Sequence, residues 1–196
     1  YDVDSPNDCI AGRVQCVDQV IRQMTTRFEP LASSCDHDAI FALTYLRVTE
    51  EYRRTVETPT FFDDASFVNH EDVLFARYYF AAYDAWAAGR TASVPPAWRV
   101  AFDAARDRAV SAYGNLLLGI NAHVQRDLPF VLYSVGLVKP DGTSRSCRRY
   151  RRTAVVTMSS TTAATTHSIS TCLVTDMMRR SPADAPGAEV VQMPTP

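Results

Sequence analysis

The distribution of aromatic residues limits the possible folds of this chain more than any other feature. All twenty aromatic residues lie between Tyr1 and Tyr150, and the last 46 residues contain none. Aromatic side chains bury large apolar areas and dominate the energetics of protein cores. We therefore expect one core-forming domain in residues 1–143. Residues 144–196 are rich in Ser, Thr, Arg and Pro, and we expect them to form a weakly packed or disordered tail.

The first 140 residues are predicted to be helical almost throughout. Apolar residues recur at helical spacing in segments such as CVDQVIRQMTTRF, and no segment shows the sustained alternation of a strand. Pro30 is expected to end the first helix, Gly89 to end the third, and Pro95 to open the fourth. The sequence predicts an all-α fold, a single bundle of about five to six helices.

A central helix is predicted in NLLLGINAHVQRD, which is apolar nearly all round. Pro129 is expected to break or kink this helix, with FVLYSVGL following as a short apolar helix. The formal net charge of −2 gives no reason to expect a nucleic-acid partner. No apolar run approaches the roughly 18 residues of a transmembrane helix. The basic run RRYRR is expected to be solvated rather than an anion site.

Three of the five cysteines lie near the N-terminus, at Cys9, Cys16 and Cys35. The absence of a C-x-x-C pair argues against a zinc ribbon or a thioredoxin motif. The simplest disulfide joins Cys9 or Cys16 to Cys35, and the odd count leaves at least one free thiol. The opening YDVDSPNDC is expected for a mature or trimmed N-terminus. These features favour a secreted or cell-envelope protein, with a cytoplasmic protein with reduced cysteines as the alternative.

Two histidines, His37 and His70, occur in the matching contexts CDHDA and VNHED. Each follows an N-cap candidate, Asp36 (with Ser34 as an alternative) or Asn69, and each precedes an acidic residue. The helix dipole disfavours imidazolium in a first turn, and neutral imidazole is the form that binds a metal or acts as a base. The alternative is that both histidines are exposed and have no function.

The segment GINAHVQRDLP places His123 and Asp127 four residues apart, on one helix face. Gly119 lies on the same line, where a ligand or another helix could approach. A buried aspartate is costly unless it is paired or bound to a metal. Asp127 is therefore a metal ligand beside His123, or it pairs with an arginine such as Arg126 or Arg47 or caps the helix at Pro129. In the last two cases His123 would donate to a backbone carbonyl.

Several long phrases carry a family resemblance: CDHDAIFALTYLRVTEEY, HEDVLFARYYFAAYDAW, VPPAWRVAFDAA and LLLGINAHVQRDLPFVL. They resemble a bacterial family of unknown function, numbered 5995 and frequent in actinobacteria. The resemblance covers residues 9–143 and implies a helical fold without assigning an activity. After PDGTSRS the chain departs from the family pattern, in which further helical sequence with aspartate and histidine is expected.

A second, local resemblance bears on chemistry. AHVQRDLP is similar to the H-x-x-x-D-x-x-x-P segment of zinc-dependent phospholipase C and P1-type nucleases, which are secreted helical phosphodiesterases. His123 and Asp127 match by spacing, whereas Pro129 falls two residues early. The resemblance implies an ester or phosphoester as the substrate. With only four histidines in the chain, we expect a site of one or two metals rather than three.

The first functional hypothesis is a metal-assisted hydrolase, with zinc the expected divalent metal, acting on a small-molecule or lipid-like substrate. The candidate metal ligands are His123, Asp127, His37 and His70, the candidate catalytic residues are His37, His70 and Asp72, and Asp38, Glu71 or Asp72 would orient the ligands. One alternative is a non-enzymatic binding module whose run FARYYFAAYDAW lines an aromatic pocket. Another is a metal-free acid–base enzyme using His123 and Asp127.

Overall fold

The computed structural model of the chain describes residues 1–58, 61–139 and 141–143. Its elements are α1 (Val14–Ser33), α2 (Asp38–Val56), α3 (Ala65–Ala87), a 3-10 helix (Thr91–Ser93), α4 (Pro96–Arg106), α5 (Ala112–Asn121), a π-helix (Ala122–Asp127) and α6 (Leu128–Val135). The predicted all-α fold is confirmed for this part of the chain. The predictions for residues 144–196, including RRYRR, lie outside the described residues.

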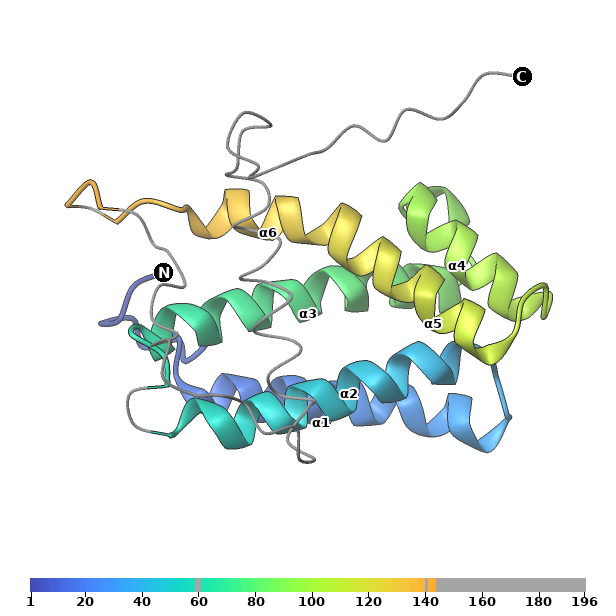
Figure 1. Ribbon diagram of the computed structural model, residues 1–196, viewed down its shortest axis with the longest axis horizontal. Helices are drawn as coiled ribbons and strands as arrows, with labels where there is room; N and C mark the ends of the chain where they lie inside the picture. The colour runs from blue at the N-terminus through green and yellow to red at the C-terminus, as the bar shows by residue number, and fades with distance from the viewer. Residues whose placement is uncertain (59–60, 140, 144–196) are drawn as a thin grey trace, which may run out of the picture.

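The helices form two sides with α3 between them (Figure 1). α1 and α2 lie side by side along one side. α5, the π-helix and α6 run end to end as one long rod along the other side, with α4 packed beside α5. The largest group of buried apolar side chains joins α1, α2, α3 and α4. No helix of the described residues is long and apolar enough to cross a membrane.

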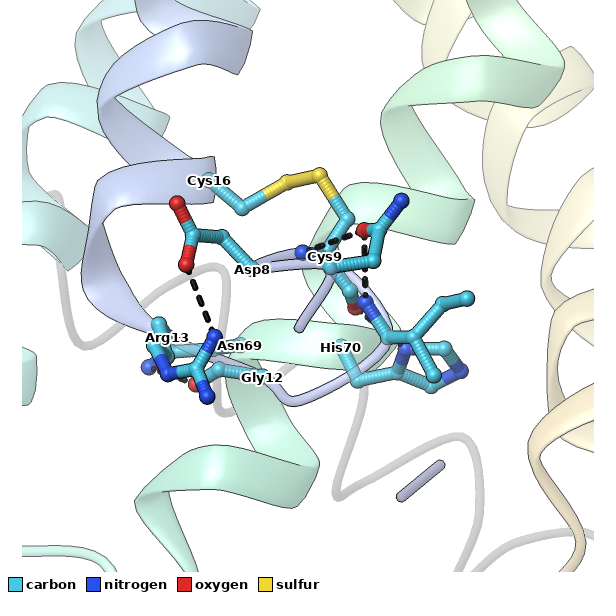
Figure 2. Close-up of a disulfide and its surroundings, with 9 residues drawn as sticks. Asp8, Cys9, Gly12, Arg13, Cys16, Asn69 and His70 are labelled. Carbon is cyan, nitrogen blue, oxygen red and sulfur yellow. Dashed lines mark hydrogen bonds and ion pairs between the residues drawn. A yellow bond between two sulfur atoms is a disulfide. The ribbon is translucent and has the colours of Figure 1, made fainter. Parts of the chain in front are cut away.

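The N-terminal loop is closed by a disulfide between Cys9 and Cys16, so the predicted pairing with Cys35 is wrong (Figure 2). Cys35 is a free, exposed thiol. The odd number of cysteines predicted at least one free thiol. The reason is distance. Cys16 is near the start of α1 and Cys35 follows its end, so about 28 Å of helix separates them. Disulfide Cα atoms lie within about 7 Å of each other.

Pro30 does not end the first helix, because α1 continues through it to Ser33. A proline in a helix removes one N–H and leaves one carbonyl without its partner. Here the chain gains the burial of Leu31 by continuing. At the helix end the Ser33 and Ser34 hydroxyls both donate to the Pro30 carbonyl.

The third helix begins earlier than predicted. Asp64, not Asn69, is its N-cap, and the Asp64 side chain accepts a hydrogen bond from the Phe67 N–H. The prediction that His70 occupies a first turn is therefore wrong, since His70 is the sixth residue of α3. Asn69 is buried and has a packing role: it accepts from the Tyr52 hydroxyl and donates to the Gly12 carbonyl.

The last helices also differ from the prediction. α4 ends at Arg106, and the chain turns through Arg108, whose φ of 49° is left-handed, before α5 begins. The buried face of α5 is formed by Asn115 and Gly119, whereas its apolar residues Leu117 and Ile120 are exposed. Phe41 of α2 occupies the space beside Gly119, so another helix makes a close approach there.

Candidate functional site

The residues His123 and Asp127 are in contact and buried, at 4% and 0% exposure. The His123 Nδ1 atom lies 3.1 Å from Asp127 Oδ2. The Trp98 indole Nε1–H donates to the same oxygen at 2.8 Å, and Arg126 donates to Oδ1 at 2.7 Å. The predicted pairing of Asp127 with Arg126 is thus confirmed, while Arg47 pairs with Glu50.

The π-helix places both residues at the centre of the rod formed with α5 and α6. The Leu128 N–H bonds to the His123 carbonyl, five residues back. Pro129 cannot donate a backbone hydrogen bond, and it occupies the start of α6, where none is needed. The predicted break at Pro129 is therefore wrong, because the helical rod runs through this residue. Single π-helical turns within α-helices occur frequently at functional sites.

An aromatic environment encloses the His123 ring. Phe75 stacks on it with ring centroids 3.6 Å apart and an interplanar angle of 5°. The Tyr45 ring centroid lies 4.5 Å away. A carboxylate can only accept, so the Nδ1 atom of His123 carries the proton toward Asp127. In the neutral ring, Nε2 is then the basic nitrogen.

Two further carboxyl groups are buried near Tyr45 and Tyr52. Asp72 is 4% exposed and Glu71 is 6% exposed, both on α3. Burial, and then the charges of Asp72 and Asp127, raise the pKa of Tyr45 well above its usual value, so its phenol stays protonated. Burial, and then the charge of Asp72, raise the pKa of Glu71 to about 7. We call Tyr45, Asp72, Trp98, His123 and Asp127 the His123 cluster.

His37 belongs to a separate site, a small pocket between α2, α4 and α5. It is the N-cap residue of α2, and its Nδ1 atom accepts a hydrogen bond from Asn115 Nδ2 at 2.8 Å. Asp38 lies beside it, and burial, with a smaller contribution from Asp36, raises the pKa of Asp38 to about 7. The remaining wall contains the rings of Phe41, Tyr79, Trp98 and Phe102. We call this the Asn115 pocket.

His70 lies against the N-terminal loop, with its Nδ1 atom 2.7 Å from the Cys9 carbonyl (Figure 2). Partial burial lowers the pKa of His70. The predicted ligands thus have three different sets of partners: His123 contacts Asp127, His37 contacts Asn115, and His70 contacts the loop. Within residues 1–58, 61–139 and 141–143, no three His, Cys, Asp or Glu side chains are grouped to hold a metal ion.

The sequence prediction missed Trp98 and Tyr45. Trp98 donates a hydrogen bond to Asp127, the partner of His123, and the Tyr45 ring lies beside the His123 ring. A buried tryptophan N–H or tyrosine O–H needs a polar partner. That rule marks Trp98 as a residue to pair with a buried acceptor. The sequence could not identify Asp127 as that acceptor, because the two residues are 29 positions apart.

Residues 17–178 match a known protein family over well more than half of the chain. The chain belongs to the family of unknown function DUF5995. The DUF5995 match starts later than the resemblance noted over residues 9–143, and it continues beyond the described residues. No curated protein and no solved structure matches the chain.

Proposed function

We propose that this DUF5995 protein is a metal-independent acid–base enzyme in which His123 is the general base. One observation carries the proposal: Asp127 Oδ2 contacts both Trp98 Nε1 and His123 Nδ1, at 2.8 Å and 3.1 Å. This shared oxygen fixes the imidazole ring and its tautomer, so that Nε2 can take a proton from a substrate. A carboxylate that orients a histidine in this way is a recurring part of acid–base sites.

Tyr45 supplies the complementary group. Because burial and two nearby carboxylates keep its phenol protonated, Tyr45 donates a hydrogen bond to an oxygen that gains negative charge as His123 removes a proton. Asp72, a predicted catalytic residue, is one of those carboxylates. The His123 side chain is only 5% exposed, so a small-molecule substrate reaches it when neighbouring rings move, in a site that excludes water.

The zinc-assisted hydrolase stays a prediction. The described residues bring together two of its proposed ligands, His123 and Asp127, whereas a catalytic zinc uses three protein ligands. We therefore derive no step through a metal. An actinobacterial origin and the similarity to phospholipase C also stay predictions. The Cys9–Cys16 disulfide supports a secreted or cell-envelope location, because disulfides persist in oxidising compartments.

The test is turnover of p-nitrophenyl esters and bis-p-nitrophenyl phosphate by the full chain, before and after EDTA. We expect turnover to survive chelation. His123→Gln should lower kcat/KM by about 10²-fold or more, the range of general base catalysis, and abolish the acidic limb of the pH profile, where activity rises as the base loses its proton. His70→Gln is the matched control, since the His70 ring bonds to the Cys9 carbonyl of the N-terminal loop and is not part of the His123 cluster.

Three results would contradict the proposal. Full activity in His123→Gln would remove His123 as the base. Activity lost on chelation and restored by zinc would favour the metal-assisted hydrolase. No turnover of any substrate, by a protein whose circular dichroism shows the expected helix, would favour the non-enzymatic binding module.

A further inference from the structure

The Asn115 pocket contains a buried acceptor without a donor. Asn115 is 4% exposed, and its Nδ2 atom is used by His37. Its Oδ1 atom is buried and has no hydrogen-bond partner within the described residues. A buried polar atom left unpaired costs about 1–3 kcal/mol. An atom in that condition on a pocket wall indicates that a donor from outside the chain completes the site.

The carboxyl group that lines the pocket has no ion-pair partner among the described residues. Asp38, which lines the pocket, is half-buried, as is Asp36 two residues before it, and neither forms an ion pair with any described residue. An anionic ligand is disfavoured for a second reason. The first-turn N–H groups of α2 are already bonded to oxygens of Asp36 and His37, so they are not available to an anion.

Aromatic rings form the opposite wall of the pocket. The Phe41 ring centroid lies 5.2 Å from that of Tyr79 and 5.3 Å from that of Trp98. Phe102 stacks on Trp98 at 5.2 Å. Aromatic faces attract cations, and groups of such rings recognise organic ammonium ions in proteins. The charge of an ammonium group therefore suits both walls, the carboxyl side and the ring side.

The size of the pocket matches an ammonium head group. About 10 Å³ is open to the centre of a water molecule, which is room for one group of that size. We propose that the Asn115 pocket binds a small primary ammonium ion, whose N–H donates to Asn115 Oδ1 and whose charge faces Asp38 and the aromatic rings. This inference is independent of the proposed enzymatic function, because it concerns binding and not turnover.

The test uses ethylammonium as the probe, with the Trp98 indole N–H resonance of the full chain as the readout. We expect a saturable shift with a Kd of about millimolar, as befits a ligand of three heavy atoms. Ethanol lacks the charge and tetramethylammonium lacks the N–H, so both should bind at least tenfold more weakly. Asp38→Asn and Asn115→Leu should each weaken ethylammonium binding at least tenfold. Asp107→Asn, an exposed acid after α4, is the matched control.

Each contrary result overturns the proposal. No saturable shift with ethylammonium would exclude the site, and equal binding of ethanol would make it a neutral pocket. Equal binding of tetramethylammonium would remove Asn115 as the acceptor. If Asn115→Leu fails to fold, Asp38→Asn decides the outcome, since Asp38 is half-buried. Unchanged ethylammonium binding in Asp38→Asn would contradict the proposed role of the carboxylate.

Discussion

The His123 cluster and the Asn115 pocket share the Trp98 side chain but differ at one buried polar residue in each, Asp127 and Asn115. In the cluster, both oxygens of the fully buried Asp127 have partners, from Trp98, His123 and Arg126. In the pocket, the oxygen of the buried Asn115 has no partner within the described residues. The comparison teaches that burial alone does not identify a binding site. A satisfied group positions its neighbours, whereas an unsatisfied one needs a ligand.

Phe41 connects the two regions physically. Its ring lies 5.3 Å from Trp98 and 5.8 Å from His123, and the same side chain fills the space beside Gly119. A displacement of the Phe41 ring in the pocket wall can therefore shift the His123 ring, because Phe41 contacts both regions. Packed interiors transmit such shifts because few voids exist to absorb them.

The largest expected effect comes from Asp127, whose two oxygens both have partners. Asp127→Ala leaves the Trp98 N–H and His123 without their shared acceptor and opens a cavity. We expect a loss of about 3–5 kcal/mol in the free energy of unfolding, the range for removing one partner of a buried ionic pair. Urea denaturation followed by circular dichroism measures it, and Asp107→Ala is an exposed control. A loss below about 1 kcal/mol would show that the network has little structural role.

Gly119→Ala tests the packing of Phe41, the side chain that lies between the two regions. A Cβ atom at position 119 would lie 2.5 Å from Phe41 Cδ2, so the Phe41 ring must shift. We expect a loss of about 1–3 kcal/mol in stability, as found for overpacked cores. Thermal denaturation measures it, with Leu117→Ala on the exposed face of the same helix as the control. An unchanged Tm would mean that Phe41 moves freely.

The pH dependence of stability compares a carboxyl group from near each region. Glu71 and Asp38 both have a pKa raised to about 7 in the folded chain, from ordinary values of 4.5 and 3.8. The folded state therefore holds more protons, and both groups make stability fall as pH rises from about 4 through 7. Glu71→Gln and Asp38→Asn should each flatten this decline, which urea midpoints at pH 4.5, 5.5, 6.5 and 7.5 measure.

The two variants should differ in degree. Glu71 is buried and Asp38 is half-buried, so water screens Asp38 more strongly and its substitution should have the smaller effect. An equal or larger effect of Asp38→Asn would show that the pocket carboxyl is as poorly solvated as Glu71. A decline that neither substitution alters would assign the pH dependence to other groups.

Asn115→Leu is expected to have the smallest effect on stability. The substitution removes a buried unpaired oxygen, which is favourable, and one hydrogen bond to the half-buried His37, which water can replace. We expect the free energy of unfolding to change by less than about 1 kcal/mol. Urea denaturation beside Asp127→Ala provides the comparison. A loss as large as that of Asp127→Ala would show that Asn115 is structural and would remove the contrast between the two regions.

Much of the fold was determined by local sequence. Helical apolar spacing predicts the all-α fold, and Pro95 correctly predicts the start of α4. The contact between His123 and Asp127 follows from the spacing of four residues, which places both on one helix face. These predictions hold because they depend on backbone geometry over a single turn.

Only tertiary structure decided the rest. The Cys9–Cys16 pairing, the helical Pro30 and the early start of α3 at Ala65 all follow from packing between elements, which outweighs local propensity. The Trp98–Asp127 hydrogen bond and the meeting of His37 with Asn115 join residues 29 and 78 positions apart. The sequence supplied the residue types for both regions, but the chemistry of each depends on distances that exist only after the helices have packed.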